Sequence, residues 1–173
     1  MGKPIIIEDY NPNWIVKFEE EKRHLKSIMK DKAIAIEHIG STSVKGLGAK
    51  EIIDIMVGVQ HLKDVEEFID PLKDVGYEHI SHAHFPNRRF FRKGLWRAGT
   101  HHLHVYKYGS KEWTSNLLFR DYLRTHPLTL KEYQQLKRSL AEKHPFDRMA
   151  YTEAKAPFIT ATIKKAENDK NNL

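Results

Sequence analysis

The sequence contains no cysteine, and this absence excludes several kinds of protein. Without thiols the chain forms no disulfide framework, no cysteine nucleophile and no zinc site with cysteine ligands. It also lacks an apolar stretch of about 20 residues, which is the length that a membrane-spanning helix needs. The N-terminus has no hydrophobic signal core. We therefore expect a cytoplasmic protein that does not bind a membrane.

The motifs of three common enzyme classes are missing too. There is no P-loop, no Gly-x-Gly-x-x-Gly segment after a strand and no Gly-x-Ser-x-Gly elbow. Positive charge is present instead, because 29 lysines and arginines against 23 acidic residues give a formal net charge of +6. A basic chain favours an anionic partner, so a nucleotide, a phosphorylated small molecule and RNA are all candidates. The sequence does not determine the oligomeric state.

Two aliphatic runs on either side of a glycine–serine turn form the most informative segment. The first run is Ala33–Ile39, and the second is Ile52–Val59 with Asp54 inside it. Gly40 lets the backbone approach a ligand closely, and Asp54 can hold a divalent cation. Hydroxyls and amides for phosphate oxygens come from the rest of the turn: Ser41, Thr42 and Ser43. This arrangement indicates nucleotide or phosphate chemistry.

Three segments together carry a family resemblance. They are His38-Ile39-Gly40-Ser41-Thr42-Ser43-Val44 with Ile52-Ile53-Asp54-Ile55, then His102-Leu103-His104-Val105, and finally Phe119-Arg120-Asp121-Tyr122-Leu123-Arg124-Thr125-His126-Pro127. In these segments the chain resembles the GrpB-like family of the nucleotidyltransferase superfamily, which has the polymerase-β-like fold. The resemblance extends from Tyr10 to Ala166. It implies a minimal nucleotidyltransferase-like fold.

Hydrophobic spacing predicts an α+β chain of one domain over residues 1–173. The expected strands are 33–39, 52–59, 77–80, 89–93 and 101–108. The expected helices are 14–29, 62–72, 110–124, 129–143 and one within 147–167. A short mixed β-sheet backed by helices therefore occupies a sheet-rich part, 1–108. A C-terminal helical extension follows over 110–167, and 168–173 is a frayed polar tail.

The superfamily resemblance implies two metal-binding carboxylates, two residues apart on one strand. Asp54 stands at the first position, but Met56 stands at the second. Methionine is a poor ligand for Mg²⁺, which prefers oxygen. Glu37 on the preceding strand is a candidate replacement, and His38 is another if the metal is softer.

Histidines on a later strand are the other candidates for chemistry. His102 and His104 share a face of the strand, so both rings can approach Asp54 from a neighbouring strand. With His38 they would suit Zn²⁺, Mn²⁺ or Fe²⁺, or one of them would act as a general base. We predict catalytic roles for Asp54, His102 and His104. The predicted cofactor is Mg²⁺ or Mn²⁺, or Zn²⁺ if histidines ligate, held by Asp54, Glu37, His38 and His104. Ordinary hydrogen bonds on a half-exposed strand are the structural alternative.

Basic and phenolic side chains are predicted to hold the anion. Arginine suits bidentate contact with phosphate, and residues four apart share one face of a helix. The candidates are Lys50, Arg89, the pair Arg120 and Arg124, and the pair Tyr133 and Lys137. Ordinary helix-surface contacts would explain each pair equally well.

Three functions follow from these features. The first is an enzyme that binds a nucleoside triphosphate or phosphorylated metabolite at Gly40–Ser43, with a metal at Asp54, and transfers a nucleotidyl group to a small-molecule acceptor. The second is a non-catalytic module for a nucleotide or a coenzyme A-like ligand, because Met56 breaks the carboxylate set and GrpB-like segments occur fused to dephospho-coenzyme A kinase. The third is RNA binding through the basic surface.

Overall fold

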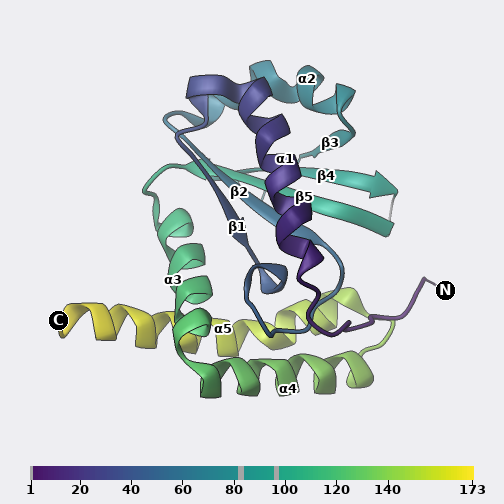
Figure 1. Cartoon of the computed structure of the whole chain (residues 1–173), viewed down its shortest axis with the longest axis vertical. Helices are drawn as coiled ribbons and strands as arrows, with labels where there is room; N and C mark the ends of the chain where they lie inside the picture. The colour runs from purple at the N-terminus through teal and green to yellow at the C-terminus, as the bar shows by residue number, and fades with distance from the viewer. Residues whose placement is uncertain (1, 82–83, 96–97) are drawn as a thin grey trace.

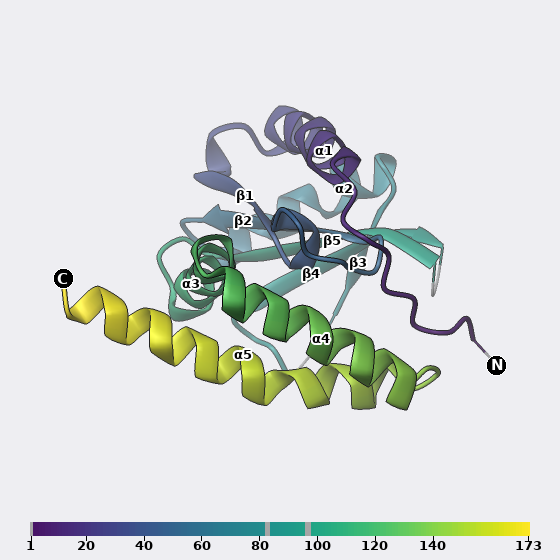
Figure 2. The same cartoon turned by 60° about the horizontal axis from the view of Figure 1, so that its bottom comes forward.

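A computed structural model describes residues 2–81, 84–95 and 98–173. Within these ranges five strands form one sheet, and helices cover both of its faces (Figures 1 and 2). Across the sheet the strands are β1 (Ala35–Ile39), β2 (Ile53–Val59), β5 (Ala98–Lys107), β4 (Arg88–Leu95) and β3 (Tyr77–Ile80). The helices are α1 (Asn13–Met29), α2 (Ile69–Asp74), α3 (Lys111–Thr125), α4 (Pro127–Lys143) and α5 (Arg148–Asn171). Short 3-10 turns are η1 (Lys30–Lys32), η2 (Ser41–Ser43) and η3 (Leu62–Phe68).

The strand pairing makes the sheet mixed. β2 pairs with β1 in the antiparallel sense and with β5 in the parallel sense, while β4 pairs antiparallel with β5 and β3. The parallel register places Asp54 opposite His102 and Met56 opposite His104. Partners in register share a face of the sheet, so the functional candidates of β2 and β5 lie together. The predicted α+β class, with a short mixed sheet backed by helices and a C-terminal helical extension, is confirmed.

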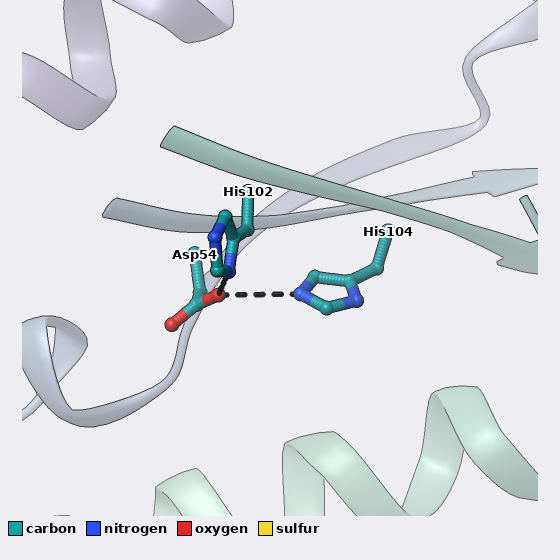
Figure 3. A group of neighbouring side chains, drawn as sticks. All are labelled: Asp54, His102 and His104. Carbon is teal, nitrogen blue, oxygen red and sulfur yellow. Dashed lines mark hydrogen bonds and ion pairs between the residues drawn. The ribbon is translucent and has the colours of Figure 1, made fainter. Parts of the chain in front are cut away.

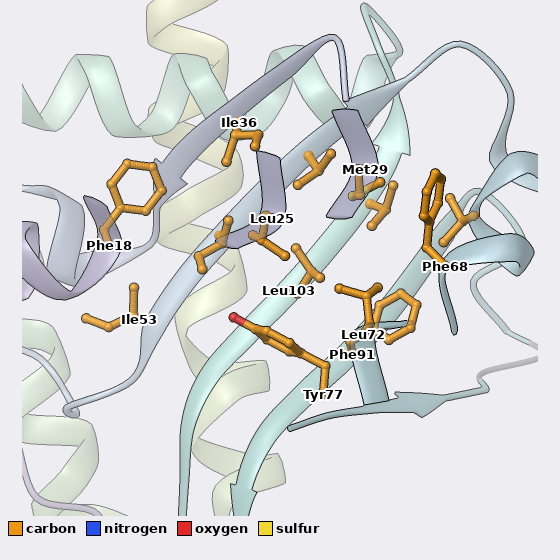
Figure 4. Close-up of a cluster of buried hydrophobic side chains, with 14 of the residues drawn as sticks. Phe18, Leu25, Met29, Ile36, Ile53, Phe68, Leu72, Tyr77, Phe91 and Leu103 are labelled. Atoms are coloured by element: carbon orange, nitrogen blue, oxygen red, sulfur yellow. The ribbon is translucent and has the colours of Figure 1, made fainter. Parts of the chain in front are cut away.

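The main hydrophobic core lies between α1, α2 and one face of the sheet (Figure 4). Alternate residues of the strands supply it, among them Ile55 on β2 and Leu103 on β5. Leu25 of α1 and Leu72 of α2 close it from above. Because side chains alternate along a strand, Asp54, Met56, His102 and His104 point to the other face, which α3, α4 and α5 cover (Figure 2).

The C-terminal helices follow the predictions in part. Ser110, at the predicted start of the helix 110–124, caps α3 with its Oγ accepting a hydrogen bond from the Trp113 amide at 3.3 Å. α4 begins at Pro127 rather than at Thr129, because proline suits the first helical turn, where its missing N–H loses no bond. α5 continues through Pro157 to Asn171, so most of the expected tail is helical. Near Pro157, Phe158 and Ile159 of α5 pack with Leu123 of α3 and Tyr133 of α4, and this packing supports the helix through the proline. Within the described ranges, no helix has both the length and the apolar character needed to cross a membrane.

Candidate functional site

A cavity of about 910 Å³ lies between the sheet and the helices α3, α4 and α5. Its volume is in the range of small-molecule sites, roughly 300–1,000 Å³. The sheet contributes acidic, imidazole and arginine side chains, and α4 and α5 contribute lysines. Aromatic rings line it between these groups, namely Phe90, Tyr106, Phe119, Tyr133 and Tyr151.

The glycine–serine turn forms one end of the cavity. Gly40 has φ +73°, and a Cβ on it would lie 2.5 Å from Oδ2 of Asp54. Glycine therefore allows the turn to sit directly against the carboxylate. The hydroxyl of Thr42 lies 2.9 Å from Nε2 of His38, and Ser43 Oγ donates to the carbonyl of Gly40. Ser41 Oγ accepts a hydrogen bond from a lysine that also lines the cavity.

Asp54, His102 and His104 converge on one point (Figure 3). Oδ1 of Asp54 lies 3.2 Å from Nε2 of His104 and 3.5 Å from Nδ1 of His102. Burial by itself would raise the pKa of the Asp54 carboxyl. The hydrogen bonds from the two histidines outweigh burial and hold the pKa well below its usual range. The carboxylate is therefore charged at neutral pH and faces two imidazoles.

These three residues can hold one divalent ion. Their ligand atoms all lie within 4.8 Å of one another, and a metal about 2.1 Å from each ligand keeps such atoms roughly 3–3.5 Å apart. Two imidazoles and one carboxylate suit Zn²⁺, Mn²⁺ or Fe²⁺ better than Mg²⁺. Met56 adds no oxygen, because it is 0% exposed and packs with Ile39 and Trp113. The cluster therefore fits one ion rather than a pair.

Three of the lysines that line the same cavity form what we call the lysine wall: Lys50 from the loop before β2, Lys137 from α4 and Lys155 from α5. Nζ of Lys50 and Nζ of Lys155 lie 5.2 Å and 4.6 Å from the ring centroid of Tyr151. Burial lowers the pKa of Lys155 to about 8, and the charge of Lys50 adds to this effect. Burial, with the charges of Lys155, Lys50 and Arg138, lowers the pKa of Lys137 to about 7. The positive charges of these neighbouring lysines repel one another, and a bound anion would relieve that repulsion. The lysine wall therefore favours an anionic ligand.

Two predicted metal ligands lie elsewhere. His38 is on the α1 side of the sheet, where its ring stacks on Phe18 with centroids 4.6 Å apart. Burial lowers the pKa of His38 to about 4, so the ring is neutral. Glu37 is on the cavity face, but its Oε2 accepts a 2.7 Å hydrogen bond from Nη1 of Arg120. Among the residues that the structure describes, the side chains grouped closely enough to hold one ion are therefore Asp54, His102 and His104, without His38 or Glu37.

The predicted anion-binding residues also divide into two groups. Gly40, Ser41, Thr42, Lys50, Arg120, Tyr133 and Lys137 line the cavity. Arg89 pairs with Val105 on the core-facing side of the sheet, and its Nη1 donates to the Pro86 carbonyl. Arg124 donates from Nε and Nη2 to the carbonyl of Ser43, at 3.2 Å and 2.7 Å. Arg89, Arg124 and Ser43 are thus not among the residues lining the cavity.

Arg88 and Lys155 are two of the lining residues that the predicted site did not include. Arg88 points to the histidine face, with Nη1 3.5 Å from Nδ1 of His104. Its signal was the alternation of Arg88 and Phe90 along the strand, which matches the alternation of the histidines. Lys155 reaches the cavity from α5. Its spacing of four from Tyr151 predicted one helix face, and the family resemblance indicated that this face forms a wall toward the sheet.

Comparison with known proteins identifies the family. A model of the family described as "GrpB protein" matches residues 4–165. The chain belongs to the GrpB family. A relative in this family, the glutamate-rich protein GrpB of Alkalihalophilus pseudofirmus, is 42% identical over 167 residues, covering 93% of this chain and 95% of that protein. The crystal structure of the conserved protein GrpB from Enterococcus faecalis has a TM-score of 0.89 and 38% identity, covering 95% of this chain and 99% of that one.

A more distant similarity reaches a longer protein. The dephospho-CoA kinase of Mycolicibacterium paratuberculosis is 26% identical over 187 residues. The match covers 94% of this chain but 46% of that kinase. This chain is therefore similar to slightly less than half of the kinase.

Proposed function

We propose that this chain binds the phosphate groups of a nucleotide or phosphorylated metabolite in the cavity and, with one divalent ion, transfers a nucleotidyl group to a small-molecule acceptor. The observation that carries the proposal is the meeting of a metal-type cluster and a lysine wall in one cavity. The family resemblance to nucleotidyltransferases supports the reaction type.

Each side chain has a defined part in this function. Asp54, His102 and His104 hold the ion, and the ion supplies charge neutralisation at the transferring phosphoryl group. The positive charges of Lys50 and Lys155 hold the phosphate groups that are not transferred. If the ion uses only part of the cluster, one histidine is free to take a proton from the acceptor.

A non-catalytic binding module is the second candidate. Met56 favours it, because the buried thioether leaves the site without the second carboxylate of the usual pair. The similarity to part of a dephospho-CoA kinase makes a coenzyme A-like ligand the first alternative to a nucleotide for such a module. RNA binding is a third candidate, and it would show steep salt dependence and affinity that grows with RNA length.

Thermal shift with a ligand panel tests the proposal. The panel combines ATP, GTP, CTP, UTP and coenzyme A with Mg²⁺, Mn²⁺, Zn²⁺ or EDTA. A ligand at about 100 times its dissociation constant adds roughly 2.7 kcal/mol of stability, which is measurable as a higher melting temperature. We expect a nucleotide shift that requires Mn²⁺ or Zn²⁺ and disappears in Asp54→Asn.

The matched control is Asp31→Asn, since Asp31 is an exposed aspartate in η1. It should behave as the wild type does. Equal nucleotide shifts in Asp54→Asn and the wild type, or no shift with any nucleotide, would refute the proposed function. A shift with coenzyme A alone would support the binding module instead.

A further inference from the structure

One hydroxyl of the glycine–serine turn differs from its neighbours. Thr42 and Ser43 use their hydroxyls inside the protein, with His38 and with the Gly40 carbonyl. Ser41 lines the cavity, and its Oγ lies 2.8 Å from Nζ of Lys137. Of the three hydroxyls, it is therefore the one that combines access to a ligand with contact to an amine.

The amine of Lys137 is held under this hydroxyl. Lys137 is 2% exposed, and its Nζ donates to the Gly48 carbonyl as well as contacting Ser41. The carbonyl can only accept, so it keeps one N–H of the amine. A neutral amine in this position directs its lone pair at the Ser41 hydroxyl, which then becomes the donor.

The surroundings favour the neutral amine. Burial is the main reason that the pKa of Lys137 falls to about 7. The charged groups that face Lys137 are Lys155 on α5, Lys50 in the loop before β2 and Arg138 on α4, and all three are cationic. The ring of Tyr133 lies 5.3 Å from Nζ, and burial raises the pKa of its phenol, so that this residue is neutral as well.

We propose that Ser41 and Lys137 are a nucleophile and its general base, and that Ser41 carries the transferred group as a covalent intermediate. The identity of the transferred group rests on the proposed function. The reactivity of Ser41 does not depend on it. Such a pair would activate the attacking hydroxyl without the second carboxylate, whose position Met56 occupies. Serine paired with lysine is a known form of activated nucleophile on unrelated folds.

The first half-reaction would run on a nucleoside triphosphate. Ser41 Oγ attacks the α-phosphorus, the Oγ–P bond forms, and the bond to the departing pyrophosphate breaks. The Oγ proton moves to Nζ of Lys137 and then to the pyrophosphate. In the second half, the acceptor hydroxyl attacks the same phosphorus, its proton goes to Lys137, and Lys137 returns a proton to Ser41 Oγ as the Oγ–P bond breaks.

A fluorophosphonate probe tests the pair without knowledge of the substrate. Attack by Ser41 forms an Oγ–P bond and releases fluoride, and Lys137 takes the proton. We expect one label per chain, located at Ser41 by peptide mass spectrometry and absent in Ser41→Ala. Ser27→Ala is the control and should label at the wild-type rate, because Ser27 is an exposed serine of α1 that does not line the cavity.

Two substitutions test the base. Lys137→Met should label at least tenfold more slowly and lose the rise in rate that the wild type shows as the pH passes about 7. Lys137→Arg keeps a positive charge but has no neutral form in this pH range. It should also be at least tenfold slower, which provides a second variant if Lys137→Met does not fold. Labelling at wild-type rates in both variants, or no label at Ser41 in the wild type, would overturn the proposal.

A nucleotide experiment separates this inference from the function on which it rests. ATP labelled at the α-phosphate is incubated with the protein and Mn²⁺, and acid-quenched protein is examined for label at Ser41. A metal-dependent nucleotide shift that requires Asp54, without a label at Ser41 from either reagent, would refute the covalent step and leave the proposed function standing. Fluorophosphonate labelling of Ser41, with no change of melting temperature on adding any nucleotide, would support the reactive pair and refute a nucleotide as the ligand.

Discussion

Replacing Gly40 by alanine tests how closely the turn and the metal cluster are packed. Gly40 has φ +73° and ψ −179°, a conformation that costs a residue with a side chain roughly 1–3 kcal/mol. The new Cβ would also lie 2.5 Å from Oδ2 and 2.9 Å from Cβ of Asp54. Such overpacking adds roughly 1–3 kcal/mol. We therefore expect Gly40→Ala to lower the free energy of unfolding by roughly 2–6 kcal/mol in total.

Gly46→Ala is the matched control for this experiment. Gly46 also has a positive φ, +85°, but a Cβ there would meet no described atom within 4 Å. The only cost of alanine at this position is the positive φ, which lowers the free energy of unfolding by roughly 1–2 kcal/mol. Urea unfolding of both variants gives the difference, and titration with Mn²⁺ gives a second readout. Gly40→Ala should also bind Mn²⁺ more weakly, because the methyl group displaces the carboxylate from His102 and His104. Equal losses of stability, with unchanged Mn²⁺ affinity, would contradict this reasoning.

Three further changes test buried charges by urea unfolding. Tyr77→Phe removes a 2.7 Å hydrogen bond to buried Glu21 and should cost about 1–3 kcal/mol, whereas Tyr108→Phe, at an exposed tyrosine, should cost less than about 0.5 kcal/mol. Burial lowers the pKa of Lys137 from 10.5 to about 7, so the unfolded chain binds more protons between these values and stability rises with pH. Lys137→Met should flatten that rise, whereas the control Lys131→Met, at an exposed lysine, should keep it. An equally steep rise in both variants would contradict the assignment of this pH dependence to Lys137. Burial alone would raise the pKa of Asp54, but the hydrogen bonds from His102 and His104 lower it below the ordinary value of 3.8. The stability that the charged carboxylate contributes is therefore present above pH 3.8 and is lost as the pH falls. Asp54→Asn should therefore lose less stability than the wild type as the pH falls below 3.8.

The sequence by itself determined the local features of this protein. Alternation along a strand put His102 and His104 on one face, because a β-strand repeats every two residues. Ser110 marked the start of α3, because a serine hydroxyl can accept from an amide of the first turn. Gly40 marked a tight turn at which the backbone can approach another group closely. These features depend on residues near one another in the chain.

Only the tertiary structure decided which of these groups meet. The parallel pairing of β2 with β5 places Asp54 beside His102, and the contact of α3 with β1 commits Glu37 to Arg120. α4 brings Lys137 under Ser41, 96 residues earlier in the chain. Periodicity gives the direction of a side chain within one element. The register of strands and the packing of helices set the distances between elements, and those depend on the whole core at once.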